Sequence, residues 1–207
     1  MKGKFITFEG CEGSGKSTQL SLFREYLEKK NIDYVFTREP GGTEIAEKIR
    51  DIILDINNKG MTDECEALLY ASSRVQHIKE KILPCLNEGK LVLCDRYIDS
   101  SFAYQAYARG MGMEFIKKIN SFALENCMPN FTVFLNINPI DAFKRKGGMD
   151  KDDRLEQCGL EFHKKVYDGY LKLSNEYKER FLMIDCSGSK METHNKIIKA
   201  LEDNKVF

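Results

Sequence analysis

The sequence lacks an excess of charge of either sign, since 32 lysines and arginines balance 32 aspartates and glutamates. Bulk binding to nucleic acid or to an anionic membrane usually needs a basic surplus, so neither partner is expected. No apolar run approaches the ~18 residues of a membrane span, and Glu9 comes too early for a signal peptide. No repeat or linker divides the chain, and its 207 residues predict a single domain over 1–207.

The chain also lacks paired cysteines. Its seven cysteines are odd in number and irregularly spaced, and no C-x-x-C pair occurs. This pattern indicates neither a disulfide framework nor a zinc site. Free thiols suit a reducing compartment, so we expect a cytoplasmic protein. Cys11 lies in a glycine-rich loop and could act as a redox switch, but a spacer role is the preferred interpretation.

That loop, residues 10–17, fits the phosphate-binding pattern G-x-x-x-x-G-K-[ST]. Its glycines let the backbone curl so that several N–H groups point at a phosphate. Lys16 can reach the β- and γ-phosphates of a nucleotide, and the Ser17 hydroxyl can ligate Mg²⁺. An apolar strand precedes the loop and a helical pattern follows it, which is the context that the motif requires. The predicted phosphate site consists of Gly10, Cys11, Glu12, Gly13, Ser14, Gly15, Lys16, Ser17 and Thr18.

Five short apolar segments alternate with helical patterns along the chain. The alternation predicts an α/β fold of three layers, in which helices flank a five-stranded parallel sheet on both faces. Ligands bind such sheets beyond the carboxyl ends of the strands, where the loop, Arg38–Glu39 and Asp95–Arg96 should converge. The strands are expected at residues 5–8, 34–37, 91–94, 131–135 and 181–184.

Two helical patterns lie between the second and third strands. Pro84 is expected to kink or end the longer one, residues 62–83. Its apolar face could serve a dimer or the core equally well. The first pattern has Ile45, Ile49, Ile52 and Ile53 on one face, and the second has a stripe of Leu68, Ala71, Val75, Ile78 and Ile82.

Two large classes of phosphate-loop protein fit this organisation. A regulatory GTPase needs the guanine-reading motif N-K-x-D, which the chain lacks, and a D-x-x-G match at 185–188 lies on the wrong strand. A small-molecule kinase needs a second pocket for an acceptor phosphate and a lid that excludes water. Arginines suit that pocket because their fork pairs bidentately with phosphate. The spare arginines at strand ends favour the kinase.

Three motifs resemble the thymidylate kinase family, most closely its bacterial members. They are F-E-G-C-E-G-S-G-K-S-T at 8–18, R-E-P-G-G-T at 38–43, and D-R-Y-I-D-S-S at 95–101 with its continuation to A-R-G at 108–110. The resemblance covers nearly the whole chain. It implies a P-loop kinase fold, a homodimer, and transfer of the γ-phosphoryl group of ATP to dTMP with Mg²⁺ as cofactor. A kinase for another nucleoside monophosphate, such as AMP, is the alternative within this class.

The resemblance implies roles for charged residues around the acceptor phosphate. Arg38 and Arg96 would clamp the phosphate of dTMP in line with ATP, and Arg50 would contact the edge of the same pocket. Glu12 would approach the acceptor sugar near its 3′-hydroxyl. The alternatives are a structural ion pair for Arg96 and a solvated loop charge for Glu12.

Other charged residues would serve the metal and the donor. By resemblance, Asp95 would hold Mg²⁺ through water, together with Ser17. Lys16 would act with Arg96 on the transferred group. Glu39 would either orient an arginine or bind a metal-linked water.

The resemblance also implies a pocket for the base and sugar. Tyr70 would stack on thymine, and Arg74, four residues later, would donate to the thymine O4 and reject cytosine. Ser101 and Gln105 would contact the N3 side of the ring. Tyr104 would pack under the sugar, where a 2′-hydroxyl would clash. Core packing is the alternative for Tyr70 and Tyr104.

A charged run at about 144–155 predicts a lid. By resemblance, Arg145 would lie against the adenine of ATP. Arg154 is the preferred residue for the phosphate contact, where an arginine can raise the rate by several powers of ten. A solvated charged loop is the alternative.

Overall fold

The computed structural model describes residues 3–146 and 158–207, and its five strands form one parallel sheet in the order β2-β3-β1-β4-β5. This confirms the predicted sheet. Each strand runs one or two residues past its predicted end, so the polar residues at the strand ends are held by the sheet itself. The strands are β1 (Phe5–Gly10), β2 (Tyr34–Arg38), β3 (Leu91–Asp95), β4 (Phe131–Asn136) and β5 (Phe181–Asp185).

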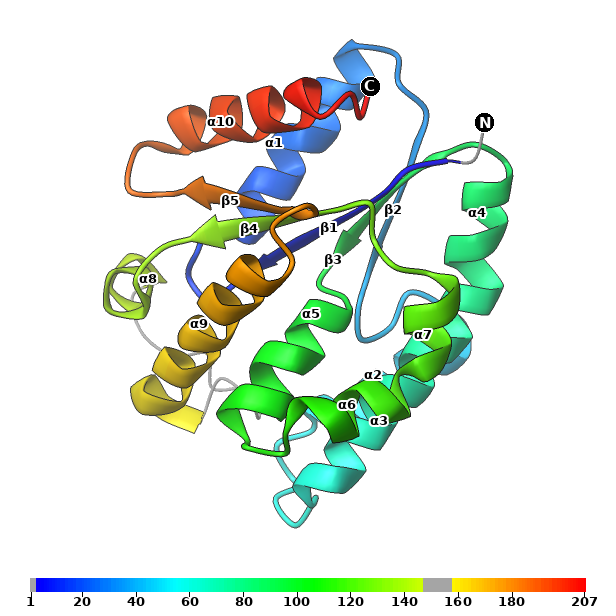
Figure 1. The fold of residues 1–207 in the computed structure, drawn as a ribbon, viewed down its shortest axis with the longest axis vertical. Helices are drawn as coiled ribbons and strands as arrows, with labels where there is room; N and C mark the ends of the chain where they lie inside the picture. Colours follow the sequence, from blue (N-terminus) through cyan, green and yellow to red (C-terminus); the bar gives the residue numbers. More distant parts are fainter. Residues whose placement is uncertain (1–2, 147–157) are drawn as a thin grey trace.

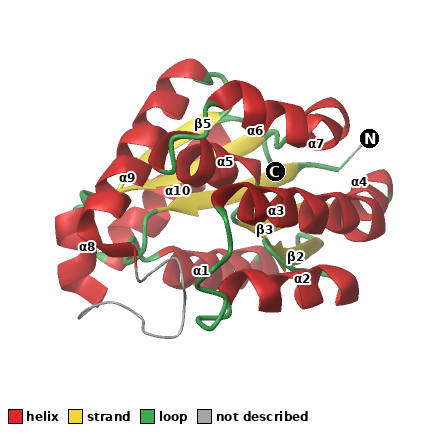
Figure 2. Ribbon diagram, turned by 90° about the horizontal axis from the view of Figure 1, so that it is seen from below, coloured by secondary structure: helices red, strands yellow, loops and turns green. Residues whose placement is uncertain are grey.

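Helices cover both faces of the sheet, as Figures 1 and 2 show. Successive side chains of β1 point to opposite faces of the sheet. Ile6 and Phe8 therefore pack in one apolar core, and Phe5 packs in the other. The Ile6 core receives α1 (Lys16–Lys29) and α10 (Lys190–Asp203), while the Phe5 core receives η2 (Phe102–Ala108) and α9 (Gly159–Glu176). This confirms the predicted three layers. Near that second face also lie α5 (Ile98–Ser101), α6 (Met113–Ile119) and α7 (Ser121–Asn126), whereas α8 (Pro139–Lys146) contributes Ala142 to the Ile6 core.

Two helices, α2 (Glu44–Leu54) and α3 (Asp63–His77), pack together between β2 and β3 in the chain. The isoleucines predicted on one face of α2 differ in burial: Ile53 is fully buried, but Ile45 is 51% and Ile52 48% exposed. On α3, Leu68 is 49% exposed. The reason is that α3 turns Glu66, Arg74 and His77 inward, which rotates Leu68 away.

The long helix does not end at Pro84. A π-helical segment, η1 (Ile78–Ile82), follows α3, and α4 (Leu83–Asn87) continues the chain. Pro84 lies in the first turn of α4, and the wider π-helical turn before it accommodates its missing N–H. Within the described residues, no helix is both long and apolar enough to cross a membrane.

Candidate active site

The phosphate loop joins β1 to α1 and has the backbone that its glycines predict. Gly13 and Gly15 adopt φ angles of 76° and 87°, in the left-handed region. A Cβ at Gly13 would lie 2.2 Å from the carbonyl oxygen of Ala142, so only glycine fits there. The Ser14 hydroxyl is buried and has no hydrogen-bond partner among the described residues. An unpartnered donor beside curled backbone amides suits an anion such as phosphate.

The thiol of Cys11 is buried within this loop. Burial raises the pKa of Cys11 to about 12, against the opposing charge of Arg96. A thiol with this pKa stays protonated near neutral pH and reacts slowly. The geometry therefore favours the spacer role over the redox switch.

The phosphate loop lines a hollow that we call the loop hollow. A second hollow, of about 300 Å³, opens beside it at the carboxyl ends of β2 and β3. We call it the acceptor cavity. All the residues that the sequence assigned to dTMP line it, although they come from four separate parts of the chain. They are Arg38, Glu39, Arg50, Tyr70, Arg74, Arg96, Ser101, Tyr104 and Gln105.

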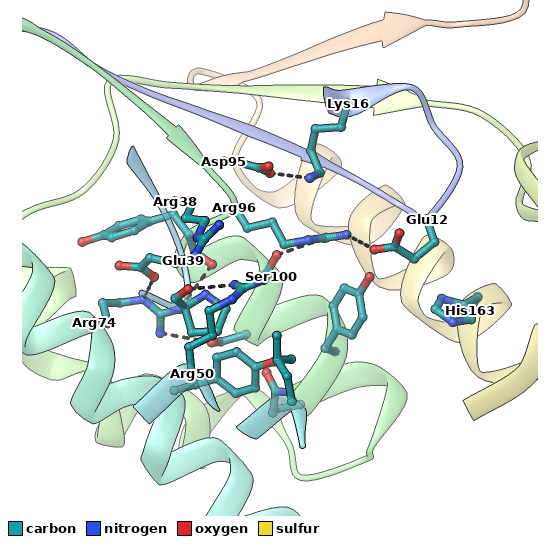
Figure 3. Close-up of a pocket in the computed structure, with 17 residues that line it drawn as sticks. Glu12, Lys16, Arg38, Glu39, Arg50, Arg74, Asp95, Arg96, Ser100 and His163 are labelled. Atoms are coloured by element: carbon teal, nitrogen blue, oxygen red, sulfur yellow. Dashed lines mark hydrogen bonds and ion pairs between the residues drawn. The ribbon is translucent and has the colours of Figure 1, made fainter. Parts of the chain in front are cut away.

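Three residues line both hollows: Glu12, Lys16 and Arg96. Arg96 Nη2 donates to Glu12 Oε1 over 2.7 Å, and its guanidinium lies 5.3 Å from the ring centroid of Tyr104. Arg96 itself has a φ of 65°, a strained conformation for a residue with a side chain. Figure 3 shows its guanidinium reaching towards Glu12. Cationic and anionic groups are thus concentrated where the two hollows meet.

Lys16 forms an ion pair with Asp95, at the end of β3. Burial, followed by the charge of Arg96, lowers the pKa of Lys16, while Asp95 opposes the shift. Ser17, in the first turn of α1, lines the loop hollow. The Asp95 carboxylate and the Ser17 hydroxyl are hard oxygen donors of the kind Mg²⁺ prefers, so these residues fit the ion.

The floor of the acceptor cavity is a buried ionic network. Arg74 is 1% exposed, and its Nε donates to Glu39 Oε2 over 2.7 Å. The other oxygen of Glu39 lies 3.0 Å from His77 Nδ1, and His77 Nε2 lies 2.7 Å from the Thr37 hydroxyl. Glu39 is therefore placed to orient an arginine, one of the two roles expected for it. Arg74 also donates to Ser101 Oγ, Asn120 Oδ1 and Tyr97 O, at 3.1, 2.6 and 3.3 Å.

The two remaining arginines lie nearer the mouth of the cavity. Arg38 Nη2 is 2.8 Å from Glu47 Oε2, and its side chain is 48% exposed. Arg50 Nη1 donates to the carbonyl oxygen of Pro40 over 2.8 Å. Both can turn towards a ligand more readily than the buried Arg74.

Arg145 is the one lid candidate within the described residues. Its Nη1 donates to the carbonyl of Cys186 over 2.8 Å, its Nη2 to that of Ser187 over 3.3 Å, and it lines the loop hollow. Arg154 and most of the predicted lid lie outside the described residues.

Some residues of the site carry no assignment from the sequence. His163 lines the acceptor cavity and packs against Phe143 and Phe162, at ring distances of 5.3 and 5.7 Å. Glu9 is buried at the end of β1. It accepts hydrogen bonds from the Tyr97 amide, the Ser100 hydroxyl and the Tyr170 hydroxyl, at 2.8, 2.7 and 2.7 Å. Glu9 lies in the motif at 8–18, but the sequence assigned no role to it or to His163, because only the folded chain brings their partners together.

Comparison with known proteins decides the family. The family model described as Thymidylate kinase matches residues 8–197. The chain belongs to this family. A thymidylate kinase of Caldanaerobacter subterraneus subsp. tengcongensis is 48% identical over 98% of this chain and 97% of its own length. Thymidylate kinases of Clostridium novyi and Bacillus pumilus are 46% and 43% identical, over 100% and 98% of this chain and 98% and 97% of their lengths. The resemblance of the three motifs to the thymidylate kinase family is thereby confirmed.

Proposed function

We infer that this protein transfers the γ-phosphoryl group of ATP to dTMP, which gives dTDP and ADP. The observation that carries this function is the sharing of Glu12, Lys16 and Arg96 between the loop hollow and the acceptor cavity. Two phosphates bound in these hollows meet at the shared residues. A regulatory GTPase needs no such second cavity. The relatives are named thymidylate kinase, so they do not favour a kinase for another nucleoside monophosphate.

In this proposal the chain acts mainly by positioning and charge stabilisation. An oxygen of the dTMP phosphate attacks the γ-phosphorus, and the bond from that phosphorus to the β,γ-bridging oxygen breaks as ADP leaves. The attacking phosphate is already anionic, so no general base is required. Lys16 and Arg96 stabilise the negative charge on the transferred group, and Arg38 and Arg96 align the acceptor.

The oxygen donors of Ser17 and Asp95 fit Mg²⁺ as the cofactor. Ser17 and Asp95 are the residues that would hold it, and it would neutralise charge on the phosphates of ATP. Asp95, which pairs with Lys16 in the structure, would hold the ion through water, and Lys16 would hold the phosphates.

The base and sugar are read at the far end of the acceptor cavity. Arg74 donates to the thymine O4, where cytosine carries a donor, and the surrounding ion pair with Glu39 fixes its direction. Tyr70 stacks on the base, Ser101 and Gln105 meet its N3 side, and Tyr104 excludes a 2′-hydroxyl.

The remaining proposals concern the lid, the assembly and the compartment. Arg154 contacts the transferred phosphate, and Arg145 lies against adenine. The protein is a homodimer, supported by the exposed apolar residues Ile45, Ile52 and Leu68 on α2 and α3. It works in the cytoplasm, without nucleic-acid or membrane partners.

Thermal unfolding with added nucleotide tests the acceptor cavity before any turnover is measured. A ligand at 100 times its dissociation constant stabilises the folded state by about 2.7 kcal/mol. We expect dTMP alone to raise the melting temperature, and GTP alone to raise it much less. Stabilisation by GTP but not by dTMP would return the regulatory GTPase as the better explanation.

A further inference from the structure

A buried chain of hydrogen bonds reaches the acceptor cavity from behind Gln105. Arg109 Nη2 donates to Glu66 Oε2 over 3.1 Å, and Gln105 Nε2 donates to Glu66 Oε1 over 2.9 Å. Glu66 is 0% exposed and is not among the described residues that line the cavity, whereas Gln105 lines it directly. Glu66 therefore reaches the cavity through Gln105.

The ion pair of Arg109 and Glu66 fixes the direction of the hydrogen bonds that link Arg109, Glu66 and Gln105. A guanidinium only donates, and the carboxylate that it pairs with only accepts. Gln105 must therefore turn its amide nitrogen towards Glu66. Its carbonyl oxygen, Oε1, then faces away, accepts no hydrogen bond from the described residues, and is not among the buried polar atoms that lack a partner. That oxygen is thus an accessible acceptor at the wall of the cavity.

We propose that Glu66, held by Arg109, orients the Gln105 carboxamide so that it presents an acceptor to the N3 edge of the bound base and rejects cytosine. The inference rests on the proposed function. Thymine and uracil carry a donor N–H at N3, which the Gln105 oxygen accepts. Cytosine has a bare acceptor nitrogen at N3, so two acceptors would meet and neither would be satisfied. Glu66 is a positioning residue for base choice, and it acts independently of Arg74 at O4.

The placement of Glu66 on α3 supports this role. Glu66, Tyr70 and Arg74 follow one another at intervals of four residues, so they share one face of the helix. Tyr70 and Arg74 line the cavity directly, and Glu66 reaches it through Gln105. One rigid helix thereby places all three contributions to base recognition.

Glu66→Gln tests the proposal because it should reverse the chain of hydrogen bonds. The new carboxamide must turn its oxygen to Arg109 and its NH₂ group to Gln105. Gln105 then turns its own oxygen inward and presents a donor to the base. We expect kcat/KM for dTMP to fall about ten- to hundredfold, the cost of one unsatisfied buried group. The value for dCMP should rise, so the ratio of dTMP to dCMP falls further.

A double variant and a matched control sharpen the test. In E66Q/Q105E, the carboxamide at 66 donates to a carboxylate at 105, whose second oxygen faces the base as an acceptor. Preference for dTMP over dCMP should return. Asp63→Asn is the control, because Asp63 lies 3.3 Å from Arg109 Nε but has no hydrogen bond to Gln105. It should leave the ratio unchanged.

Each outcome decides one claim. If the native chain shows no preference for dTMP, the proposed function fails. If the native chain prefers dTMP and folded Glu66→Gln keeps the native ratio of dTMP to dCMP, only the role of Glu66 is overturned. Should Glu66→Gln fail to fold, the double variant decides, since it retains one buried carboxylate in the chain of hydrogen bonds. Loss of the dTMP preference in the double variant also overturns the inference.

Discussion

Arg96 Nη2 lies 2.7 Å from Glu12 Oε1, and this pair stands at the junction of the loop hollow and the acceptor cavity. Both residues sit immediately after strands or in the loop that a strand feeds, so the sheet fixes their separation. A cation held against the loop in this way is preorganised for charge that develops between two phosphates.

Arg96→Ala should therefore lower kcat by about a thousandfold or more, since cationic contacts to the transferred group have effects of this size. Steady-state ADP release at saturating ATP and dTMP measures it. Lys48→Ala is the control, because Lys48 is 70% exposed and pairs only with Glu44 among the described residues. A variant of Arg96 with near-native kcat would reduce Arg96 to a structural ion pair.

Arg74→Ala should change both stability and base choice. It leaves Glu39, whose side chain is 2% exposed, buried without its guanidinium, which costs about 3–5 kcal/mol. KM for dTMP should rise, and discrimination against dCMP should relax. Urea unfolding and kcat/KM for both acceptors measure these effects. Lys199→Ala, on the exposed side of α10, should alter neither, and unchanged discrimination in Arg74→Ala would remove Arg74 from base recognition.

Arg154→Ala separates the lid from the acceptor cavity. If Arg154 contacts the transferred phosphate, kcat falls sharply while the dissociation constant for dTMP, measured by calorimetry, stays near the native value. Lys151→Ala, in the same charged run of the sequence, is the matched control. An unaltered kcat would exclude Arg154 from the transition state and leave Arg145 as the candidate.

The buried carboxyl group of Glu9 should make the free energy of unfolding depend on pH. Burial is the main cause that raises the pKa of Glu9 from 4.5 to about 7. The folded state holds this proton more tightly than the unfolded state, so its contribution is fully present below pH 4.5 and is lost as pH rises through about 7. This contribution of Glu9 to the free energy of unfolding is on the order of 3 kcal/mol. Glu9→Gln should remove this slope in urea unfolding between pH 5 and 8.

Glu25→Gln, on the exposed surface of α1, is the control for that slope. It should leave the pH dependence as it is in the native chain. If Glu9→Gln also keeps the native slope, the buried carboxylate of Glu9 does not titrate in this range.

The exposed apolar residues of α2 and α3 are the surface through which we expect the homodimer to form. Leu68→Glu should convert a dimer to a monomer in size-exclusion chromatography with light scattering, because a carboxylate would have to be buried at the interface. Met191→Glu is the control, since Met191 is 47% exposed on α10. A native chain that runs as a monomer at micromolar concentration would contradict the homodimer.

The fold could be predicted from the sequence because its signals are local. Apolar runs with helical patterns between them specify a parallel sheet, and that topology brings the carboxyl ends of β1, β2 and β3 to one edge. The lining of the acceptor cavity followed from the resemblance, which assigned Tyr70 and Gln105 although they lie 35 residues apart.

The supporting residues could not be predicted because their chemistry is tertiary. Glu9 and His77 gain their roles from partners that the fold supplies. Glu9 lies in the motif at 8–18 but outside the general phosphate-loop pattern at 10–17, and His77 lies in none of the quoted motifs. The side of α3 that faces the core could not be predicted for a related reason. Apolar spacing placed Leu68 on a stripe that could face either the core or a partner, and the buried ion pair of Arg74 and Glu39 determines which face turns inward.

The proposed function is tested by measuring ADP release with ATP and Mg²⁺ in the presence of dTMP, dUMP, UMP, dCMP or AMP, and without an acceptor. We predict turnover dominated by dTMP, with little for UMP and dCMP, and almost none without acceptor. Turnover dominated by AMP or another monophosphate would contradict the assignment of the acceptor cavity. Hydrolysis that does not depend on any acceptor would contradict the kinase itself.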